Sequence, residues 1–312
     1  MASNKPSVFI DGEAGSTGVE VRKRLEAVSE ITLRSLPSAQ RKDLSARQDM
    51  MAACDLVVLC LPDEAAREAV ALAGELGGDA PKLLDASTAH RVDPEWTYGF
   101  PEMSPVQPGQ IAGSRKVANP GCYATGAIGL LRPLVQAGLV PPDHPISISG
   151  VSGYSGGGRP MIEAHDRDGG PAFELYALGL EHKHVPEIER FAGLSRRPIF
   201  VPSVGHFRQG MLVCVPLYLD DLPGRPTSAD LREALRAFYE GSEHVAVAAG
   251  DGQGKLELEA LNGTNRLELY VWANEAHHHA VLVARLDNLG KGASGAAVQN
   301  LGLMLDLDPG PD

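Results

Sequence analysis

Short apolar runs alternate with helix-forming segments along the first third of the chain. Helices are predicted at residues 19–28 and 63–76. Strands are predicted at residues 7–11, 31–36, 56–62, 82–85 and 116–118. Strands that alternate with helices of this length form βαβ units, and the strands of such units pair in parallel. The pattern therefore predicts an α/β domain with a doubly wound parallel sheet.

The pattern changes after residue 118. A helix is predicted at residues 228–239, with Ser228 as its N-cap. Longer runs, several of which alternate apolar and polar residues, predict strands at residues 146–151, 198–201, 211–219, 245–249, 266–273 and 280–287. This mixture is typical of an α+β domain with a mostly antiparallel sheet.

The last apolar segment is rich in Gly and Ala and predicts a helix at residues 292–305. We expect that helix to pack back onto the first domain. Residues 1–118 and 288–312 are accordingly predicted to form one domain, and residues 119–287 the other.

Three glycines join the first predicted strand to the first predicted helix. They are Gly12, Gly15 and Gly18, with Ser16 and Thr17 between the last two. Glycine permits a tight turn and lets the backbone approach a pyrophosphate at the helix N-terminus. Ordinary turns share this GxxGxxG spacing, but the place between a strand and a helix favours dinucleotide binding by a Rossmann-type domain.

The end of the second strand indicates which dinucleotide binds. NAD is usually held there by an Asp or Glu on the ribose 2′-hydroxyl, whereas NADP needs groups that hold a 2′-phosphate. This chain has Arg34 and Ser35 at that point, which favours NADP(H) as the cofactor. The alternative is that Arg34 is a solvated charge at a strand end.

Cys122 follows an Asn-Pro-Gly turn and precedes an apolar run, residues 126–131, that reads as a helix. Such a turn places a thiol at a helix N-terminus, where unpaired N–H groups and the helix dipole favour the thiolate. A thiolate attacks carbonyl carbon well near neutral pH. Cys54, Cys60 and Cys214 instead fit the commoner pattern of buried structural cysteines.

A catalytic thiolate needs a partner for proton transfer. His206 is the candidate acid/base, because it lies in a Gly-flanked loop just before a strand. His182 and His184 are further candidates at the site. Arg91 and Arg159 could each hold a phosphate or carboxylate in a bidentate contact. Structural salt bridges are the alternative for both arginines.

Composition narrows the function further. The chain has 312 residues and a formal net charge of −12, which disfavours nucleic acid as a partner. No apolar run approaches the length of about 20 residues that spans a membrane, and the first residues lack a signal peptide's apolar core. A cytoplasmic location is expected. The four cysteines form no CxxC pair, so no metal site is expected.

Several short motifs occur together along nearly the whole chain. Their residues are Gly12, Gly15, Gly18; Asp85, Ser87, Arg91; Tyr98, Gly99, Pro101, Glu102; residues 119–123; Ser152, Gly153, Arg159; His182, His184, Pro186, Glu187; and Asn288, Leu289, Lys291, Gly292, Ala293, Gly295, Ala297, Gln299 and Asn300. Together they resemble the N-acetyl-γ-glutamyl-phosphate reductases, the acyl-phosphate reductases of arginine biosynthesis.

The chain resembles the shorter subgroup of that family. Many longer members carry a Pro-His pair where this chain has Pro202 and Ser203, and the loop around His206 looks more like that of aspartate-semialdehyde dehydrogenases. The resemblance also implies a homodimer or homotetramer. It adds Ser87, Gly157 and Asn288 as expected cofactor contacts.

The reaction implied by the resemblance is NADPH-dependent reduction of N-acetyl-γ-glutamyl phosphate to the semialdehyde, through a thioester on Cys122. His206 would stabilise the thiolate and protonate the thiohemiacetal oxygen. Backbone N–H groups at Cys122, with Asn119 nearby, would stabilise the oxyanion. Arg91, Asn119, Arg159, His182 and His184 would contact the substrate.

Four other functions compete with this one. An acyl-phosphate reductase for aspartyl phosphate differs only in the substrate pocket. A carrier-bound substrate would favour a basic docking surface, which the acidic charge disfavours. A thiol hydrolase or acyltransferase leaves the glycine turn unexplained, and a nucleotide sensor leaves Cys122 unexplained.

Overall fold

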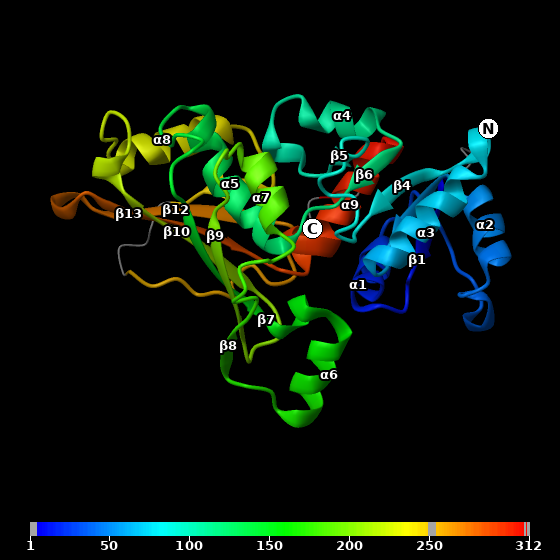
Figure 1. The fold of residues 1–312 in the computed structure, drawn as a ribbon. Helices are drawn as coiled ribbons and strands as arrows, with labels where there is room; N and C mark the ends of the chain where they lie inside the picture. Colours follow the sequence, from blue (N-terminus) through cyan, green and yellow to red (C-terminus); the bar gives the residue numbers. More distant parts are fainter. Residues whose placement is uncertain (1–4, 249–253, 309, 311–312) are drawn as a thin grey trace. The chain divides into compact units, whose positions relative to one another are not determined.

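The computed structural model describes residues 5–248, 254–308 and 310, and it divides the chain into two compact units. Unit 1 runs to Pro120 and resumes at Ala293, and unit 2 spans Gly121–Gly292 (Figure 1). The chain therefore returns to unit 1 a few residues after position 288, where we predicted the boundary.

Unit 1 contains a parallel sheet with the strand order β2-β1-β3-β4-β6-β5. Its strands are β1 (Ser7–Asp11), β2 (Thr32–Arg34), β3 (Leu56–Leu59), β4 (Lys82–Asp85), β5 (Thr97–Tyr98) and β6 (Lys116–Ala118). Every pairing in this sheet is parallel. The doubly wound sheet is thus confirmed, and strand order reverses beside β1, where such sheets bind their ligands.

Helices cover both faces of this sheet (Figure 1). They are α1 (Ser16–Leu25), α2 (Leu44–Ala52), α3 (Asp63–Gly74), α4 (Gln107–Gly113) and α9 (Gly295–Leu305). Val8 of β1 packs into a core with Val21 of α1 and Leu301 of α9. Phe9, which points to the other face, packs with Met51 and Ala69 of α2 and α3. The predicted return of the C-terminal helix to the first domain is confirmed.

Unit 2 contains a second sheet with the order β11-β12-β13-β10-β7-β9-β8. Its strands are β7 (Ser147–Gly153), β8 (Phe173–Leu175), β9 (Ile199–Gly205), β10 (Met211–Tyr218), β11 (Val245–Val247), β12 (Leu267–Asn274) and β13 (His279–Leu286). Two pairings, β7–β9 and β11–β12, are parallel, and the others are antiparallel. The mostly antiparallel sheet is confirmed. Residue 249, predicted to end the strand at 245–249, lies outside the described residues.

One face of this sheet packs against α5. The helices of unit 2 are α5 (Cys122–Gln136), α6 (Gly158–Asp168), α7 (Val185–Ala192) and α8 (Ser228–Phe238). A Cβ at Gly126 of α5 would lie 2.8 Å from the Val213 side chain of β10, so glycine allows the helix and sheet to approach closely. No helix among the described residues is long and apolar enough to cross a membrane.

The N-cap of α8 is Thr227, one residue before the predicted Ser228. The Thr227 hydroxyl accepts from the backbone N–H of Asp230, and the Asp230 carboxylate accepts from the Thr227 backbone N–H. This reciprocal pair is a capping box, which satisfies two otherwise unpaired N–H groups.

We expect Thr227→Ala to lower the free energy of unfolding by about 1 kcal/mol, because it leaves the N–H of Asp230 without its cap. Ser228→Ala is the matched control and should change stability by less than about 0.5 kcal/mol. Urea denaturation of both variants checks this. Equal losses would mean that the capping box does not set the start of α8.

Candidate active site

The glycine turn of unit 1 has the backbone geometry that a nucleotide-binding loop requires. Gly12 has φ +92°, and a Cβ there would lie 2.3 Å from the carbonyl oxygen of Cys60. A Cβ at Gly18 would lie 2.3 Å from the carbonyl oxygen of Gly12. The Gly15 N–H donates to that same oxygen at 2.9 Å, which closes the turn. Helix α1 begins directly afterwards at Ser16, so its first N–H groups can bind a pyrophosphate.

We expect Gly18→Ala to weaken NADPH binding at least about tenfold, because the new methyl group forces the turn away from α1. Gly74→Ala is the control, since a Cβ at that glycine meets nothing within 4 Å. Fluorescence titration with NADPH checks both variants. Wild-type affinity in Gly18→Ala would show that close packing of the turn is not needed for binding.

A cavity of about 430 Å³ adjoins this turn. Its lining includes the apolar side chains of Leu36, Leu61 and Ala65. The charged residues of the lining are Arg41, Lys42, Arg47, Asp11, Glu13 and Glu68. Apolar walls suit an adenosine, and the cations of the lining can hold a phosphate that it carries. The residues of unit 1 thus fit an NADP(H) cofactor.

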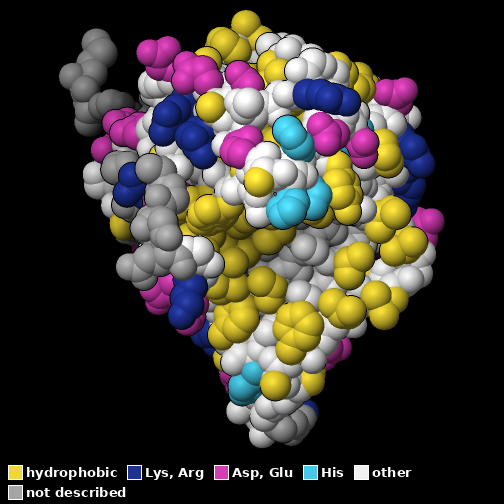
Figure 2. Space-filling model, turned by 90° about the vertical axis from the view of Figure 1, so that its left-hand side faces the viewer, with side chains coloured by type: hydrophobic (Ala, Val, Ile, Leu, Met, Phe, Trp, Pro, Cys, Tyr) yellow, Lys and Arg dark blue, Asp and Glu magenta, His cyan; other side chains and the backbone are white. Residues whose placement is uncertain are grey.

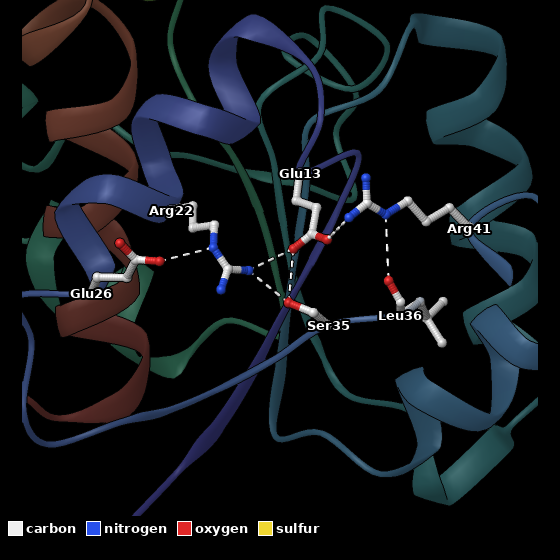
Figure 3. A network of polar contacts seen from close by, with 6 residues as sticks. All are labelled: Glu13, Arg22, Glu26, Ser35, Leu36 and Arg41. Atoms are coloured by element: carbon white, nitrogen blue, oxygen red, sulfur yellow. Dashed lines mark hydrogen bonds and ion pairs between the residues drawn. The ribbon is translucent and has the colours of Figure 1, made fainter. Parts of the chain in front are cut away.

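Ser35 lies within a network of charged groups that includes Glu13 and Arg41 of this cavity (Figure 3). Its hydroxyl donates to Glu13 at 2.8 Å and accepts from Arg22 at 2.6 Å. Arg41 forms an ion pair with Glu13 at 2.6 Å. Arg34 is exposed on β2, and its charge acts on the Cys54 thiol instead. The structure therefore brings Arg22, which the sequence did not single out, to Ser35, and brings Arg41, which follows Ser35 in the chain, to the same Glu13 carboxylate.

Two of the other expected cofactor residues, Ser87 and Asn288, are fixed by buried hydrogen bonds. In unit 1, the Ser87 hydroxyl donates to the buried Asp85 carboxylate at 2.7 Å. In unit 2, the Asn288 side chain accepts from the Gly210 N–H at 2.8 Å and donates to Ser155 at 2.9 Å, so it joins two loops. Gly157 borders the cavity beside Cys122.

Cys122 is the first residue of α5, as the sequence predicted, and Gly121 is the N-cap. A Cβ at Gly292 would lie 2.7 Å from the Cys122 Cβ, so only glycine fits there. The helix N-terminus favours a thiolate at this position. Burial acts in the opposite direction on two other thiols and raises the pKa of Cys54 to about 11 and that of Cys60 to about 12.

Cys122 lies in a cavity of about 250 Å³. The residues that line it are Cys122, Tyr123, Ser152, Gly156, Gly157, Met161, Tyr176, His182, Lys183, His184 and Val204. Two imidazoles, a lysine and two tyrosines thus share one small space with the thiol. This set can hold an anionic substrate and move protons.

The two histidines of this cavity are held in defined positions. The backbone N–H of His184 donates to His182 Nδ1 at 3.1 Å, which leaves the proton of a neutral His182 on Nε2. His184 Nε2 lies 3.9 Å from an oxygen of Glu187. The other Glu187 oxygen accepts from the Gly121 N–H at 3.1 Å, directly before Cys122. Glu187 is 1% exposed and so connects the start of α5 to His184 inside the protein.

Tyr176 is a cavity residue that sequence reasoning missed. Burial raises the pKa of its phenol to about 12, and the neighbouring Cys122 charge acts in the same direction. The hydroxyl is therefore protonated at neutral pH and can donate a hydrogen bond. Tyr176 follows the short edge strand β8, and the sequence around it forms no motif that could have identified it.

His206, the expected acid/base, lies elsewhere in unit 2. Its side chain is exposed, and its Nδ1 lies 2.9 Å from Nδ1 of the buried His165 on α6. The His165 ring stacks on Tyr154 at 4.6 Å. His206 is not among the residues that line the Cys122 cavity. The structure thus brings His182 and His184 to the thiol.

The remaining substrate candidates have different surroundings. Arg159 is exposed on α6 and pairs with Glu163 one helical turn away at 2.7 Å. Arg91 is partly buried in unit 1 and donates to the Ala86 carbonyl at 3.3 Å. The Asn119 amide donates to the Ala293 carbonyl at 3.0 Å and accepts from Asn300 at 3.0 Å, so it holds the returning tail.

No cluster of His, Cys, Asp and Glu among the described residues could hold a metal ion. The chemistry of these residues is that of a thiol nucleophile with acid/base partners. If the reaction is a reduction, a second group besides these side chains must supply the electrons.

Each of the two units matches a known protein-family model. Residues 7–111 match the family model described as "Semialdehyde dehydrogenase, NAD binding domain". Residues 122–288 match "Semialdehyde dehydrogenase, dimerisation domain". The two matches fall within the two units of the structure.

Solved structures share the fold. Aspartate semialdehyde dehydrogenase II from Vibrio cholerae superimposes with a TM-score of 0.73 at 17% identity and covers 97% of this chain and 99% of its own. Aspartate semialdehyde dehydrogenase with NADP from Candida albicans superimposes with a TM-score of 0.64 at 13% identity and covers 96% of this chain and 99% of its own. At these identities the likeness shows the fold alone.

Sequence relatives are much nearer. N-acetyl-gamma-glutamyl-phosphate reductase 2 of Pseudomonas putida is 50% identical over 306 residues, which cover 96% of this chain and 97% of the relative. The N-acetyl-gamma-glutamyl-phosphate reductase of Rhizobium meliloti is 48% identical over 310 residues, with 96% and 99% coverage. The chain therefore belongs to the N-acetyl-γ-glutamyl-phosphate reductase family of the semialdehyde dehydrogenases.

Proposed function

We propose that this protein catalyses the NADPH-dependent reduction of N-acetyl-γ-glutamyl phosphate to N-acetylglutamate 5-semialdehyde, with release of phosphate. The observation that carries the proposal is Cys122 at the first position of α5, in one cavity with His182 and His184. The relatives named for this reaction, at about half identity over nearly the whole chain, support the choice of substrate.

The first half of the reaction uses residues of unit 2 alone. The Cys122 thiolate, stabilised at the N-terminus of α5, attacks the acyl carbon. The bond from that carbon to the phosphate oxygen breaks, phosphate leaves with the electron pair, and a thioester remains on Cys122. Lys183 and the two histidines supply positive charge or hydrogen bonds where negative charge develops.

The second half reduces the thioester. NADPH, when bound, supplies the hydride that the thioester carbonyl accepts. The backbone N–H at the start of α5 stabilises the resulting oxyanion. The histidine pair protonates this oxygen and then takes the proton back as the carbon–sulfur bond breaks, which releases the aldehyde and restores the thiolate. Tyr176 donates a hydrogen bond in the same cavity.

The cofactor is held by unit 1. The Gly12–Gly18 turn and the first N–H groups of α1 bind the pyrophosphate. Arg22, Arg41 and Ser35 supply the groups for a ribose 2′-phosphate.

The assay that tests the proposal runs the reaction in reverse. NADP reduction is followed at 340 nm with phosphate and either N-acetylglutamate semialdehyde or aspartate semialdehyde. We expect phosphate-dependent activity on the first aldehyde only. Activity on aspartate semialdehyde alone would keep the mechanism and change the substrate. Inactivity on both, with NADPH still bound, would refute the proposed reaction.

We further propose that two copies associate through the face of the unit 2 sheet opposite α5. Trp272, Val281 and Pro216 are direct cross-strand neighbours on β12, β13 and β10, and all three are partly or fully exposed. The next row contains Tyr270 and Val283, which are buried, and the half-buried Cys214. Figure 2 views the side of the molecule that lies on the left in Figure 1, and hydrophobic side chains gather across the middle of that side. The family model's description as a dimerisation domain supports this proposal.

We expect Val281→Asp to shift the protein toward the monomer, because it places a charge in the middle of this apolar row. Val92→Asp, at an exposed valine of unit 1, is the control. Sedimentation velocity over a range of protein concentrations checks both variants. An unchanged sedimentation coefficient for Val281→Asp would mean that another surface forms the interface.

A further inference from the structure

A carboxylate of the chain itself lies at the centre of the charged network beside the glycine turn (Figure 3). Glu13 Oε2 accepts from Arg22 Nη1 at 2.7 Å and from the Ser35 hydroxyl at 2.8 Å. Its Oε1 accepts from Arg41 Nη2 at 2.6 Å. Only 8% of Glu13 is exposed. The three donors come from α1, from the residue after β2 and from the segment beyond it, and they converge on one anion.

This arrangement has the geometry of a phosphate site. Two guanidinium groups and a hydroxyl surround two acidic oxygens, and charge-assisted bonds of this kind also bind phosphate. The network lies where the strand after the glycine turn ends, which is the place at which Rossmann-type domains read the ribose 2′ position. The cavity with walls of Leu36, Leu61 and Ala65 borders both Glu13 and Arg41. A 2′-phosphate of an adenosine in that cavity needs the donors that Glu13 uses.

We propose that Glu13 competes with the ribose 2′-phosphate of NADP(H) for Arg22, Arg41 and Ser35, and so sets how strongly the protein prefers NADP(H) over NAD(H). The inference rests on the proposed function, because it takes the cofactor from there. Binding of the 2′-phosphate exchanges one anion for another on the same donors, and Glu13 has to move away. A nucleotide with a free 2′-hydroxyl leaves the Glu13 ion pairs intact.

Glu26 supplies a matched comparison. It pairs with the Nε of the same Arg22 at 2.9 Å, but its side chain is 56% exposed and lies on the opposite side of Arg22 from Ser35 (Figure 3). Glu26→Gln and Glu13→Gln therefore remove the same charge from the same arginine. Only Glu13→Gln releases the donors that converge beside the cavity.

The test measures binding by isothermal titration calorimetry with two probes, adenosine 2′,5′-bisphosphate and adenosine 5′-monophosphate. Neither contains nicotinamide, so the readout depends on unit 1 and not on turnover. We expect Glu13→Gln to bind the bisphosphate about tenfold more tightly than wild type and the monophosphate within about twofold. Glu26→Gln should stay within about twofold for both probes.

Equal changes for both probes in Glu13→Gln would overturn the proposal. Weaker binding of the bisphosphate would also overturn it, because Glu13 would then only hold the arginines in position. If Glu13→Gln loses its native circular dichroism spectrum, the Arg41→Gln variant is measured instead. Its affinity for the bisphosphate should fall about tenfold, and its affinity for the monophosphate should hardly change. An equal loss of affinity for both probes would refute the competition. If wild-type protein binds neither probe but binds NADPH, the competition alone fails. If it binds no nucleotide, the proposed function fails with it.

Discussion

Cys122→Ser is expected to lower kcat/KM for the acyl phosphate on the order of 10³-fold or more, because the hydroxyl of serine is a far weaker nucleophile than a thiolate. The change is small in volume, so α5 and the packing of Gly292 against residue 122 should persist. Cys122 lies in unit 2, whereas the glycine turn lies in unit 1. NADPH affinity should therefore stay within about twofold of wild type.

Cys54→Ser is the matched control, since Cys54 is a buried thiol of unit 1 whose pKa is raised by burial to about 11. It should retain activity. A chemical readout separates loss of the nucleophile from loss of the fold: iodoacetamide should label Cys122 first among the four thiols at pH 7, as measured by peptide mass spectrometry. Turnover in Cys122→Ser would exclude the thioester route.

Local patterns in the sequence were enough to predict the parts of the site that lie on one element. The glycine turn and the first residue of α5 depend on neighbours within a few positions, because turns and helix starts are set locally. Cys122 could therefore be placed at a helix N-terminus before the structure was known. The apolar strands of unit 1 were predictable for the same reason, since they are buried on both faces.

The cationic groups around Ser35 were not predictable in this way. Adjacent residues in an extended segment point to opposite sides, so Arg34 and Ser35 face different surroundings. Ser35 meets Glu13, whereas the charge of Arg34 acts on Cys54. Arg22 reaches Ser35 from α1, and Arg41 reaches Glu13 from the segment after β2; only the tertiary fold brings these groups together. The alternation along the strand was the one signal that argued against pairing Arg34 with Ser35.

The choice among ten histidines also required the fold. His206 was favoured for its loop position, but that loop contacts α6 through His165. The segment before α7 carried a usable signal: Pro186 and Glu187 mark a helix start, which fixes the backbone next to His184. The sequence could not predict that Glu187 accepts a hydrogen bond from the N–H of Gly121. This contact brings the start of α7 to the start of α5.

The second large effect is expected at this histidine pair. His182→Gln and His184→Gln should each lower kcat by about 10²- to 10⁴-fold, the usual range for loss of a general acid/base. Glutamine keeps a polar amide of similar size but cannot accept and return a proton at neutral pH. NADPH affinity should be unchanged in both variants.

His206→Gln is the decisive comparison, because it tests the assignment that the sequence favoured. The exposed position of His206 and its contact with His165 predict a kcat within about threefold of wild type. A readout on the thiol adds a second criterion: the rate of Cys122 alkylation at pH 7 should fall in the cavity variant whose imidazole stabilises the thiolate, and should not change in His206→Gln. A large loss of kcat in His206→Gln, with wild-type activity in both cavity variants, would return the acid/base role to His206. It would also mean that the loop before β10 reaches Cys122 during turnover. The opposite result would assign proton transfer to the segment that Glu187 holds against α5, so that one buried carboxylate positions both the nucleophile's helix and its proton partner.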